Sequence, residues 1–127
     1  MAQQQALLDL LDENLAYVNW ILDETPEECL HWLSDPGANS MAVTLWHCAR
    51  ALDVFKTLHV ANLPDSEELW IKHGWAEKTG YDPRGIGTHG WGQLTGYSQA
   101  EAAAVPRFDK ETLRQYTQEV LGGIKAY

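Results

Sequence analysis

Apolar residues recur at alternating spacings of three and four in three segments of the chain, which is the pattern of an amphipathic α-helix. The first segment runs from about residue 4 to 23, and its repeating positions are Leu8, Leu11, Leu15, Val18 and Leu22. The last runs from about 110 to 126, and its repeating positions are Leu113, Tyr116, Val120 and Ile124. Between them, residues 40–61 carry the longest apolar pattern. We therefore expect three long helices.

The segment 40–61 has a wide apolar side and a polar side. Its repeating apolar positions are Met41, Leu45, Cys48, Leu52, Phe55 and His59, widened by Ala51, Val54 and Leu58. The opposite side carries Arg50, Asp53, Lys56 and Thr57. We expect the apolar stripe to be buried and the charged side to face solvent. Cys48 then packs as a small hydrophobic residue, and neither it nor Cys29 is expected to be reactive.

Capping residues indicate shorter helices between these three. Thr25, Pro26 and Glu28 fit the start of a helix that ends near Trp32; Asp35-Pro36-Gly37 then interrupts the chain, and Asn39 or Ser40 caps the central helix. Asp65 and Glu68 fit the start of a short helix that carries Leu69 and Trp70. Ser98 with Glu101 has the spacing of a capping box, and Asp109 precedes the last helix.

The stretch from Gly74 to Tyr97 has no helical or strand period and contains seven glycines. Long irregular connections in compact domains are commonly lids or binding loops. Its aromatic residues Trp75, Trp91 and Tyr97 are candidates for the walls of a ligand or cofactor pocket. Residues 85–90 match GxGxxG, but that phosphate-binding motif works only between a strand and a helix. We expect these glycines instead to adopt positive φ angles, which other residues rarely do.

Together these elements predict one all-α domain over residues 1–127, an up-down helical bundle with a glycine-rich loop. Three long helices leave one side of a bundle open, since antiparallel helices bury their apolar stripes best when four enclose the core. A second copy of the chain is the simplest way to close that side, so we expect a homodimer.

The excess of acidic over basic residues argues against anionic binding partners. Eighteen acidic and nine basic residues give a net charge of −9. Such a chain is repelled by polyphosphate and by anionic membrane surfaces, so we expect no nucleic-acid or membrane partner. No apolar run has the length of a membrane span, and the N-terminus lacks the features of a signal peptide, which favours a cytoplasmic location.

The five histidines are the main candidates for chemistry. None of them is spaced three or four residues from another, so no single helix presents a pair of metal ligands. His47 projects towards Ala51, Val54 and Leu58, which makes it either a metal ligand or a hydrogen-bonded core residue. His73 and His89, in the loop region, are weaker metal candidates. No motif for nucleophilic hydrolysis is present.

The stretch from Pro36 to His47, PGANSMAVTLWH, resembles the second-helix signature S-[IM]-x-x-x-[LI]-x-H of the DinB/YfiT-like superfamily. The resemblance covers Leu7 to about His59. It implies a four-helix bundle, usually dimeric, that holds zinc or nickel through one histidine of the second helix and an HxxxH pair of the last. His47 corresponds to the first of these ligands. No HxxxH follows, so we expect either a chain truncated before a fourth long helix or a reduced variant.

Two functions remain open at this level. The resemblance implies a divalent-metal-dependent S-transferase for a small-molecule substrate, or a relative of one, that uses a low-molecular-weight thiol; the metal would lower the pKa of a bound thiol or water. The alternative is a non-catalytic helical bundle that binds a small apolar ligand or a protein partner, with His47 as a hydrogen-bonded core residue.

Overall fold

The computed structural model describes residues 2–35 and 37–127, and the regular structure in this part of the chain is entirely helical. The α-helices are α1 (Ala2–Glu24), α2 (Glu27–Leu30), α3 (Met41–Val54), α4 (Leu69–Lys72), α5 (Trp75–Thr79), α6 (Gln99–Ala103) and α7 (Lys110–Ala126). The π-helical turn η1 (Phe55–Val60) continues α3, while η2 (Asp65–Glu67) and η3 (Thr88–Gly90) are single 3-10 turns. The predicted all-α class and the three long helices are confirmed. No helix of this part is both long and apolar enough to cross a membrane.

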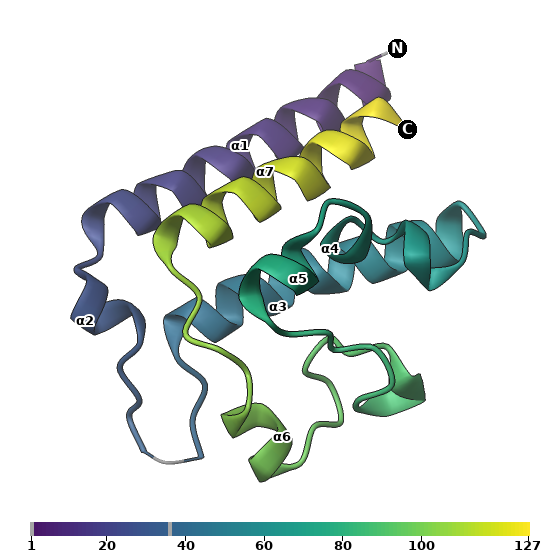
Figure 1. Cartoon of the computed structure of the whole chain (residues 1–127). Helices are drawn as coiled ribbons and strands as arrows, with labels where there is room; N and C mark the ends of the chain where they lie inside the picture. The colour runs from purple at the N-terminus through teal and green to yellow at the C-terminus, as the bar shows by residue number, and fades with distance from the viewer. Residues whose placement is uncertain (1, 36) are drawn as a thin grey trace.

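Helix α7 packs against α1 along one of its sides and against α3 along another, and the two chain termini lie close together at one end of the α1–α7 pair (Figure 1). The predicted inner positions of α7 are correct, because Leu113, Tyr116 and Val120 are buried and Ile124 is half-buried. The stripe predicted for α1 is also correct. Its member Leu22 is buried, and Leu8, Leu11, Leu15 and Val18 are half-buried.

The orientation predicted for the central helix is wrong. Met41, Cys48, Leu52 and Phe55 of the predicted buried stripe are exposed. The buried side of this helix carries Ala42, Trp46, Ala49, Arg50, Asp53, Val54 and Thr57. The prediction that Val54 is buried is confirmed. Both sides of α3 are rich in apolar residues, so periodicity alone does not decide which one faces the core, and the charged residues that marked a solvent side are paired inside the protein.

Aromatic side chains form the core between α3, α7 and the middle of the chain. Trp46 stacks on Phe108 at a centroid distance of 5.6 Å, and Trp70 meets the Tyr116 ring edge-on at 4.8 Å. Trp75 lies 6.3 Å from Trp70 in a stacked arrangement. Such contacts add to the burial of large apolar areas. The core is therefore built by tryptophans that the helical periodicity did not single out.

A buried polar network joins the central helix to the segments that follow it. The Arg50 guanidinium lies 2.8 Å from a carboxylate oxygen of Glu68. Asp53 accepts hydrogen bonds from the Leu69 and Trp70 backbone N–H groups, at 2.8 and 2.9 Å, and from the Tyr116 hydroxyl at 2.7 Å. Buried charges are tolerated only with such partners. The network fixes the start of α4 against α3 and α7.

The predicted short helices are confirmed in part. Ser40 caps α3, Ser98 and Glu101 form the predicted capping box of α6, and Asp109 caps α7. Thr25 does not cap α2, which covers only Glu27–Leu30; the Thr25 hydroxyl contacts the sulfur of Met41 instead. Asp65 does not cap α4 either, because Asp53 takes that role from α3. Pro36, in the predicted break, lies outside the described residues.

The stretch from Gly74 to Tyr97 is not wholly irregular, since it contains α5 and η3. Its seven glycines all have positive φ angles, as expected for the GxGxxG match and its neighbours. At Gly92 the chain passes so close to Pro83 that a Cβ atom would stand 2.1 Å from the Pro83 carbonyl oxygen. Arg50 donates hydrogen bonds to the Trp91 and Gly92 carbonyls, both at 2.9 Å. The stretch is thereby held as a fixed wall against α3.

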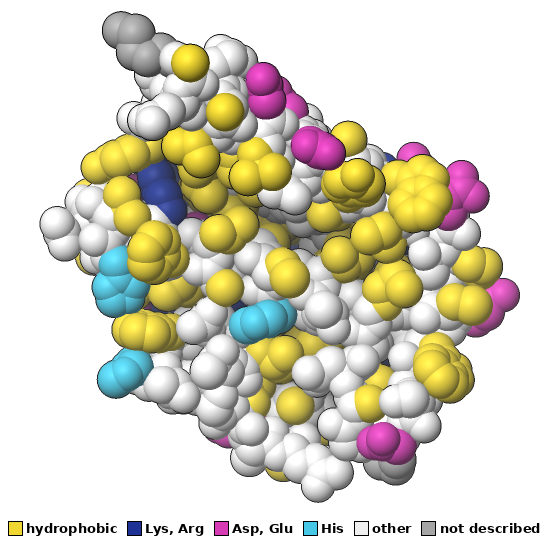
Figure 2. Space-filling view, turned by 180° about the vertical axis from the view of Figure 1, so that it is seen from behind, with side chains coloured by type: hydrophobic (Ala, Val, Ile, Leu, Met, Phe, Trp, Pro, Cys, Tyr) yellow, Lys and Arg dark blue, Asp and Glu magenta, His cyan; other side chains and the backbone are white. Residues whose placement is uncertain are grey.

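Large apolar side chains remain exposed on the outer sides of α1 and α3. Figure 2 shows hydrophobic side chains gathered in a band across the face seen from behind. On α1 these exposed residues include Leu7, Leu10, Tyr17 and Trp20, and on α3 and η1 they include Met41, Leu52 and Phe55. The bundle of a single chain thus has an open apolar side.

Candidate ligand cleft and the histidines around it

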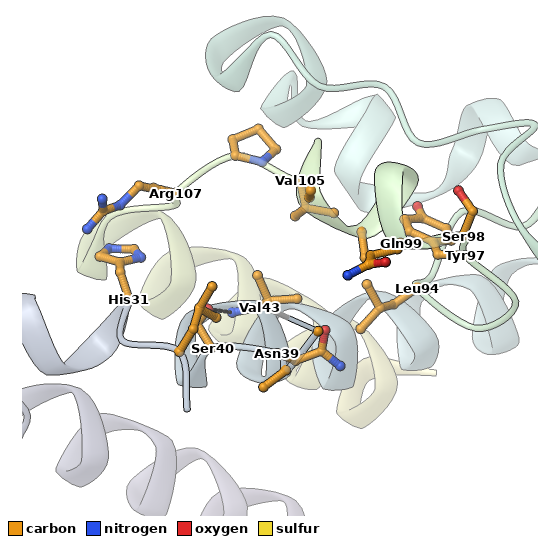
Figure 3. A pocket seen from close by; sticks show the side chains of 16 residues that line it. His31, Asn39, Ser40, Val43, Leu94, Tyr97, Ser98, Gln99, Val105 and Arg107 are labelled. Carbon is orange, nitrogen blue, oxygen red and sulfur yellow. Dashed lines mark hydrogen bonds between the residues drawn. The ribbon is translucent and has the colours of Figure 1, made fainter. Parts of the chain in front are cut away.

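A cleft of about 720 Å³ opens between the α2–α3 connection, the first turns of α3, the end of the glycine-rich stretch and the α6–α7 connection. Figure 3 shows His31 and Arg107 at one end of the cleft, Leu94, Tyr97 and Gln99 at the other, and Ser40 and Val43 between them. The cleft thus combines apolar side chains with a few polar ones, which is the usual composition of small-molecule sites.

Helix caps fix the walls of this cleft. The Ser40 hydroxyl accepts a hydrogen bond of 3.1 Å from the Val43 N–H, which sets the first turn of α3. On the opposite wall, the Ser98 N–H donates to the Glu101 carboxylate at 2.8 Å and the Glu101 N–H donates to the Ser98 hydroxyl at 3.1 Å. The ends of α3 and α6 that border the cleft are therefore held by their own sequence.

Tyr97 forms part of the cleft wall and is anchored from behind. Its hydroxyl lies 3.0 Å from the hydroxyl of Tyr81, which is buried. Burial raises the pKa of both phenols above the ordinary value of 10, and for Tyr81 the hydrogen bond to Tyr97 adds to the rise. Both groups stay protonated around neutral pH. Tyr97 can present its ring and a hydroxyl, but it does not supply a base.

His47 lies one turn beyond the cleft on α3 and is half-buried. Its Nδ1 is paired with the Gln93 backbone carbonyl. Gln93 also borders a second, smaller hollow of about 290 Å³, lined by Ala51, Leu52, Val54, Phe55, His59 and Trp91. His47 thus attaches the glycine-rich stretch to α3. Because a carbonyl only accepts, Nδ1 carries the proton and Nε2 is left as the acceptor nitrogen.

The other histidines lie in separate places. His59 and His89 contact the indole of Trp91, with centroid distances of 4.9 and 4.6 Å. His73 follows α4 instead, and its Nδ1 lies 2.6 Å from a carboxylate oxygen of Glu119 on α7. The same Glu119 oxygen accepts a 2.9 Å hydrogen bond from the Trp75 indole. His31 has a buried side chain whose Nε2 is 3.3 Å from Glu27.

The predicted site residues are not brought together. His47 meets a carbonyl, His73 meets Glu119, and His89 meets Trp91; in the described part of the chain no group of three or more histidine, cysteine or acidic side chains could share a metal ion. Zinc sites in proteins normally use three or four protein ligands, so a zinc ion at any of these histidines would need donors beyond the contacts described above. The pocket candidates are also apart: Trp75 is in the core, Trp91 lines the smaller hollow, and Tyr97 lines the cleft.

Sequence reasoning missed the cleft-lining residues His31 and Arg107. Neither belongs to a motif, and they come from connections that are far apart in the sequence, one before α3 and one after α6. The sequence signals nearest to the cleft are the helix caps at Ser40 and Ser98, because both residues line it. A search of protein-family models and of curated proteins finds no match to this sequence. The DinB/YfiT-like resemblance therefore stays a prediction.

Proposed function

We propose that this protein binds a small organic molecule in the cleft beside α3 and α6. The observation that carries the proposal is the cleft itself, whose volume of about 720 Å³ falls within the roughly 300–1,000 Å³ typical of ligand sites. Its walls are held by helix caps, so little conformational entropy is lost when a ligand enters. This proposal corresponds to the non-catalytic alternative reached from the sequence.

Filling the cleft with a bulky side chain tests this proposal. Ala102 and Ala100 both lie on α6, but only Ala102 lines the cleft, and Ala100 is exposed. A library of small organic molecules is screened against the wild type by thermal shift, and hits are measured by calorimetry. We expect Ala102→Trp to abolish binding of the hits and Ala100→Trp to retain it. Binding that survives Ala102→Trp, or a screen without hits, would refute the proposal.

We also propose that two copies associate through the open apolar side formed by α1 and α3. The repeating positions on the open side of α1 are Leu7, Leu10, Asn14, Tyr17 and Ile21, and those on α3 are Met41, Leu45, Cys48, Leu52 and Phe55. None of these ten residues is charged, although the chain carries a net charge of −9. A two-fold contact would place the two apolar faces against each other without opposing like charges.

The exposed area supports this association. The large apolar side chains of this face are 39–63% exposed, and they include Leu7, Leu10, Tyr17, Trp20, Met41, Leu52 and Phe55. Exposed apolar side chains that gather on one face are typical of protein-interaction surfaces.

Metal-dependent thiol transfer is a second candidate, favoured by one observation. Metal-ligating histidines commonly donate their second ring N–H to a carbonyl or carboxylate, and His47 has its Nδ1 on the Gln93 carbonyl. The candidate requires further donors beside Nε2 of His47. Metal content after incubation with zinc or nickel tests it. Stoichiometric uptake that is lost in His47→Ala but kept in His73→Ala would support it, and uptake well below one ion per chain would exclude it.

A further inference from the structure

We propose that the ligand of the cleft is a small carboxylic acid, with its carboxylate at the Arg107 end and its apolar part against Val43 and Leu94. The inference rests on the proposed binding function and adds the chemical class of the ligand. The main support for this inference is the charge of the cleft. None of its sixteen lining residues is Asp or Glu, whereas Arg107 and His31 are basic.

This charge contrasts with the rest of the molecule. Eighteen acidic residues are spread over the chain, and several lie next to the cleft in sequence. The carboxylates of these neighbours accept hydrogen bonds from nearby backbone N–H groups. Asp35 accepts one from Gly37, Glu101 from Ser98 and Asp109 from Thr112, each at 2.8 Å. Their carboxylates are therefore held at helix and turn backbones. The cleft is left as an acid-free region on a strongly acidic protein.

Arg107 differs from the other three arginines of the chain. Arg50 pairs with Glu68, Arg84 with Asp82, and Arg114 with Asp23, at distances of 2.7 to 2.8 Å. For Arg107, no carboxylate lies within ion-pair distance among the described residues. In a chain with twice as many acids as bases, a guanidinium without a partner at the end of a cleft is a ready site for an external carboxylate.

The backbone on both sides of Arg107 is held in place, while the Arg107 side chain is exposed at the end of the cleft. Its neighbours Val105 and Phe108 are buried, and the Phe108 N–H donates a 3.0 Å hydrogen bond to the Pro106 carbonyl. His31 lies at the same end of the cleft (Figure 3). Because its Nε2 already faces Glu27 at 3.3 Å, we assign the main anion contact to Arg107 and a secondary contact to His31.

The middle and the other end of the cleft suit the apolar part of such a ligand. Val43 and Leu94 are half-buried, Val105 is buried, and the Tyr97 ring forms the adjoining wall. The amides of Asn39 and Gln99 border this region and provide polar contacts for a substituent. An amphipathic acid therefore matches the cleft better than a sugar or a phosphorylated compound, which would bring many polar groups against these side chains.

The experiment compares carboxylates with uncharged analogues. A panel of straight-chain and aryl-substituted carboxylates and the corresponding primary amides is titrated into the wild type, Arg107→Gln and Lys110→Gln. Lys110 is the matched control: it is three residues away, lies outside the cleft lining, and its substitution changes the net charge equally. We expect at least one carboxylate to bind about tenfold more tightly than its amide. Arg107→Gln should remove that difference by weakening the carboxylate alone, and Lys110→Gln should preserve it.

Two results would overturn the inference: carboxylates that bind no better than their amides, or a preference that persists in Arg107→Gln. Failure of the inference remains distinguishable from failure of the proposed function. If uncharged compounds bind and are lost only in Ala102→Trp, the cleft is a binding site but the carboxylate assignment is wrong. If no compound of any class depends on Ala102, the binding function itself is wrong.

Discussion

Asp53 shows how one side chain can decide the position of a whole segment. Its carboxylate accepts three hydrogen bonds, from two backbone N–H groups at the start of α4 and from the Tyr116 hydroxyl of α7. The sequence pattern places Asp53 on the polar side of the central helix, which predicts that it faces solvent. In the structure it is only 2% exposed, because the chain after η1 folds back over it and supplies the donors.

Replacing Asp53 by Ala should lower the free energy of unfolding by about 3 kcal/mol or more, because the substitution leaves the Leu69 and Trp70 N–H groups and the Tyr116 hydroxyl without their acceptor. Urea unfolding followed by tryptophan fluorescence measures the change. The control is Asp9→Ala, where an exposed carboxylate accepts a hydrogen bond from the Gln5 side chain and the change should stay within about 0.5 kcal/mol. Equal effects of the two substitutions would show that the Asp53 network contributes nothing.

Glu68 should make stability depend on pH. Burial raises the pKa of its carboxyl above the ordinary value of 4.5, and the nearby Arg50 opposes this rise without cancelling it. The folded state therefore keeps the proton to higher pH than the unfolded state does. The resulting stabilisation is complete below pH 4.5 and is lost as the pH rises through the raised pKa.

In Glu68→Gln this titration is absent. The unfolding free energy of the wild type should therefore decline relative to that of the variant as the pH is raised from about 4 to 7. Urea unfolding at a series of pH values measures both curves. A difference between wild type and variant that is independent of pH would contradict the expected shift.

At the scale of elements, side chains of α3 attach the glycine-rich stretch to that helix. Arg50 holds the Trp91 and Gly92 carbonyls, and His47 holds the Gln93 carbonyl. Three successive residues are thus tied to α3 by two of its side chains. The stretch separates the cleft from the smaller hollow and gives both of them a fixed boundary.

Gly92→Ala should destabilise the fold more than Gly80→Ala. Both glycines have positive φ, +64° and +73°, so each substitution carries the cost of a left-handed conformation, about 1–2 kcal/mol. Only at Gly92 would the added Cβ collide with backbone, 2.1 Å from the Pro83 carbonyl oxygen, whereas nothing lies within 4 Å at Gly80. Thermal unfolding of the two variants measures the difference. Equal losses of stability would mean that the approach to Pro83 imposes no constraint.

At the scale of the whole molecule, the outer sides of α1 and α3 leave large apolar side chains exposed to solvent. A three-helix layer buries α7 from both sides but leaves an uncharged stripe on each of its outer helices. Proximity of Thr25 to Met41 brings the end of α1 to the start of α3. Figure 2 shows a band of hydrophobic side chains across the face seen from behind. A second copy would bury this face and complete a bundle.

Light scattering on the purified chain should give the mass of a dimer. Leu52→Glu should shift the mass to that of a monomer, because it places a charge on the exposed apolar side of α3. The matched control is Leu63→Glu, since Leu63 is similarly exposed, 43% against 39%, but lies beyond η1 and outside the two stripes. A wild type that is monomeric at micromolar concentration would refute the dimer.

The sequence by itself determined the helical class, the positions of the long helices and the caps at Ser40, Ser98 and Asp109, because helical period and capping are local properties of a few consecutive residues. It also determined which side of α7 faces inward, since that helix has one dominant apolar stripe. On α1 the predicted stripe faces inward as well, although the outer side also carries large apolar residues.

The tertiary structure alone decided which side of α3 is buried, because that helix has two apolar sides and its charged residues find partners only when α4, α7 and the glycine-rich stretch fold against it. It likewise decided that His31 and Arg107 border the same cleft and that His47 meets a carbonyl. Contacts between residues distant in sequence depend on how the chain packs, and no local pattern encodes them.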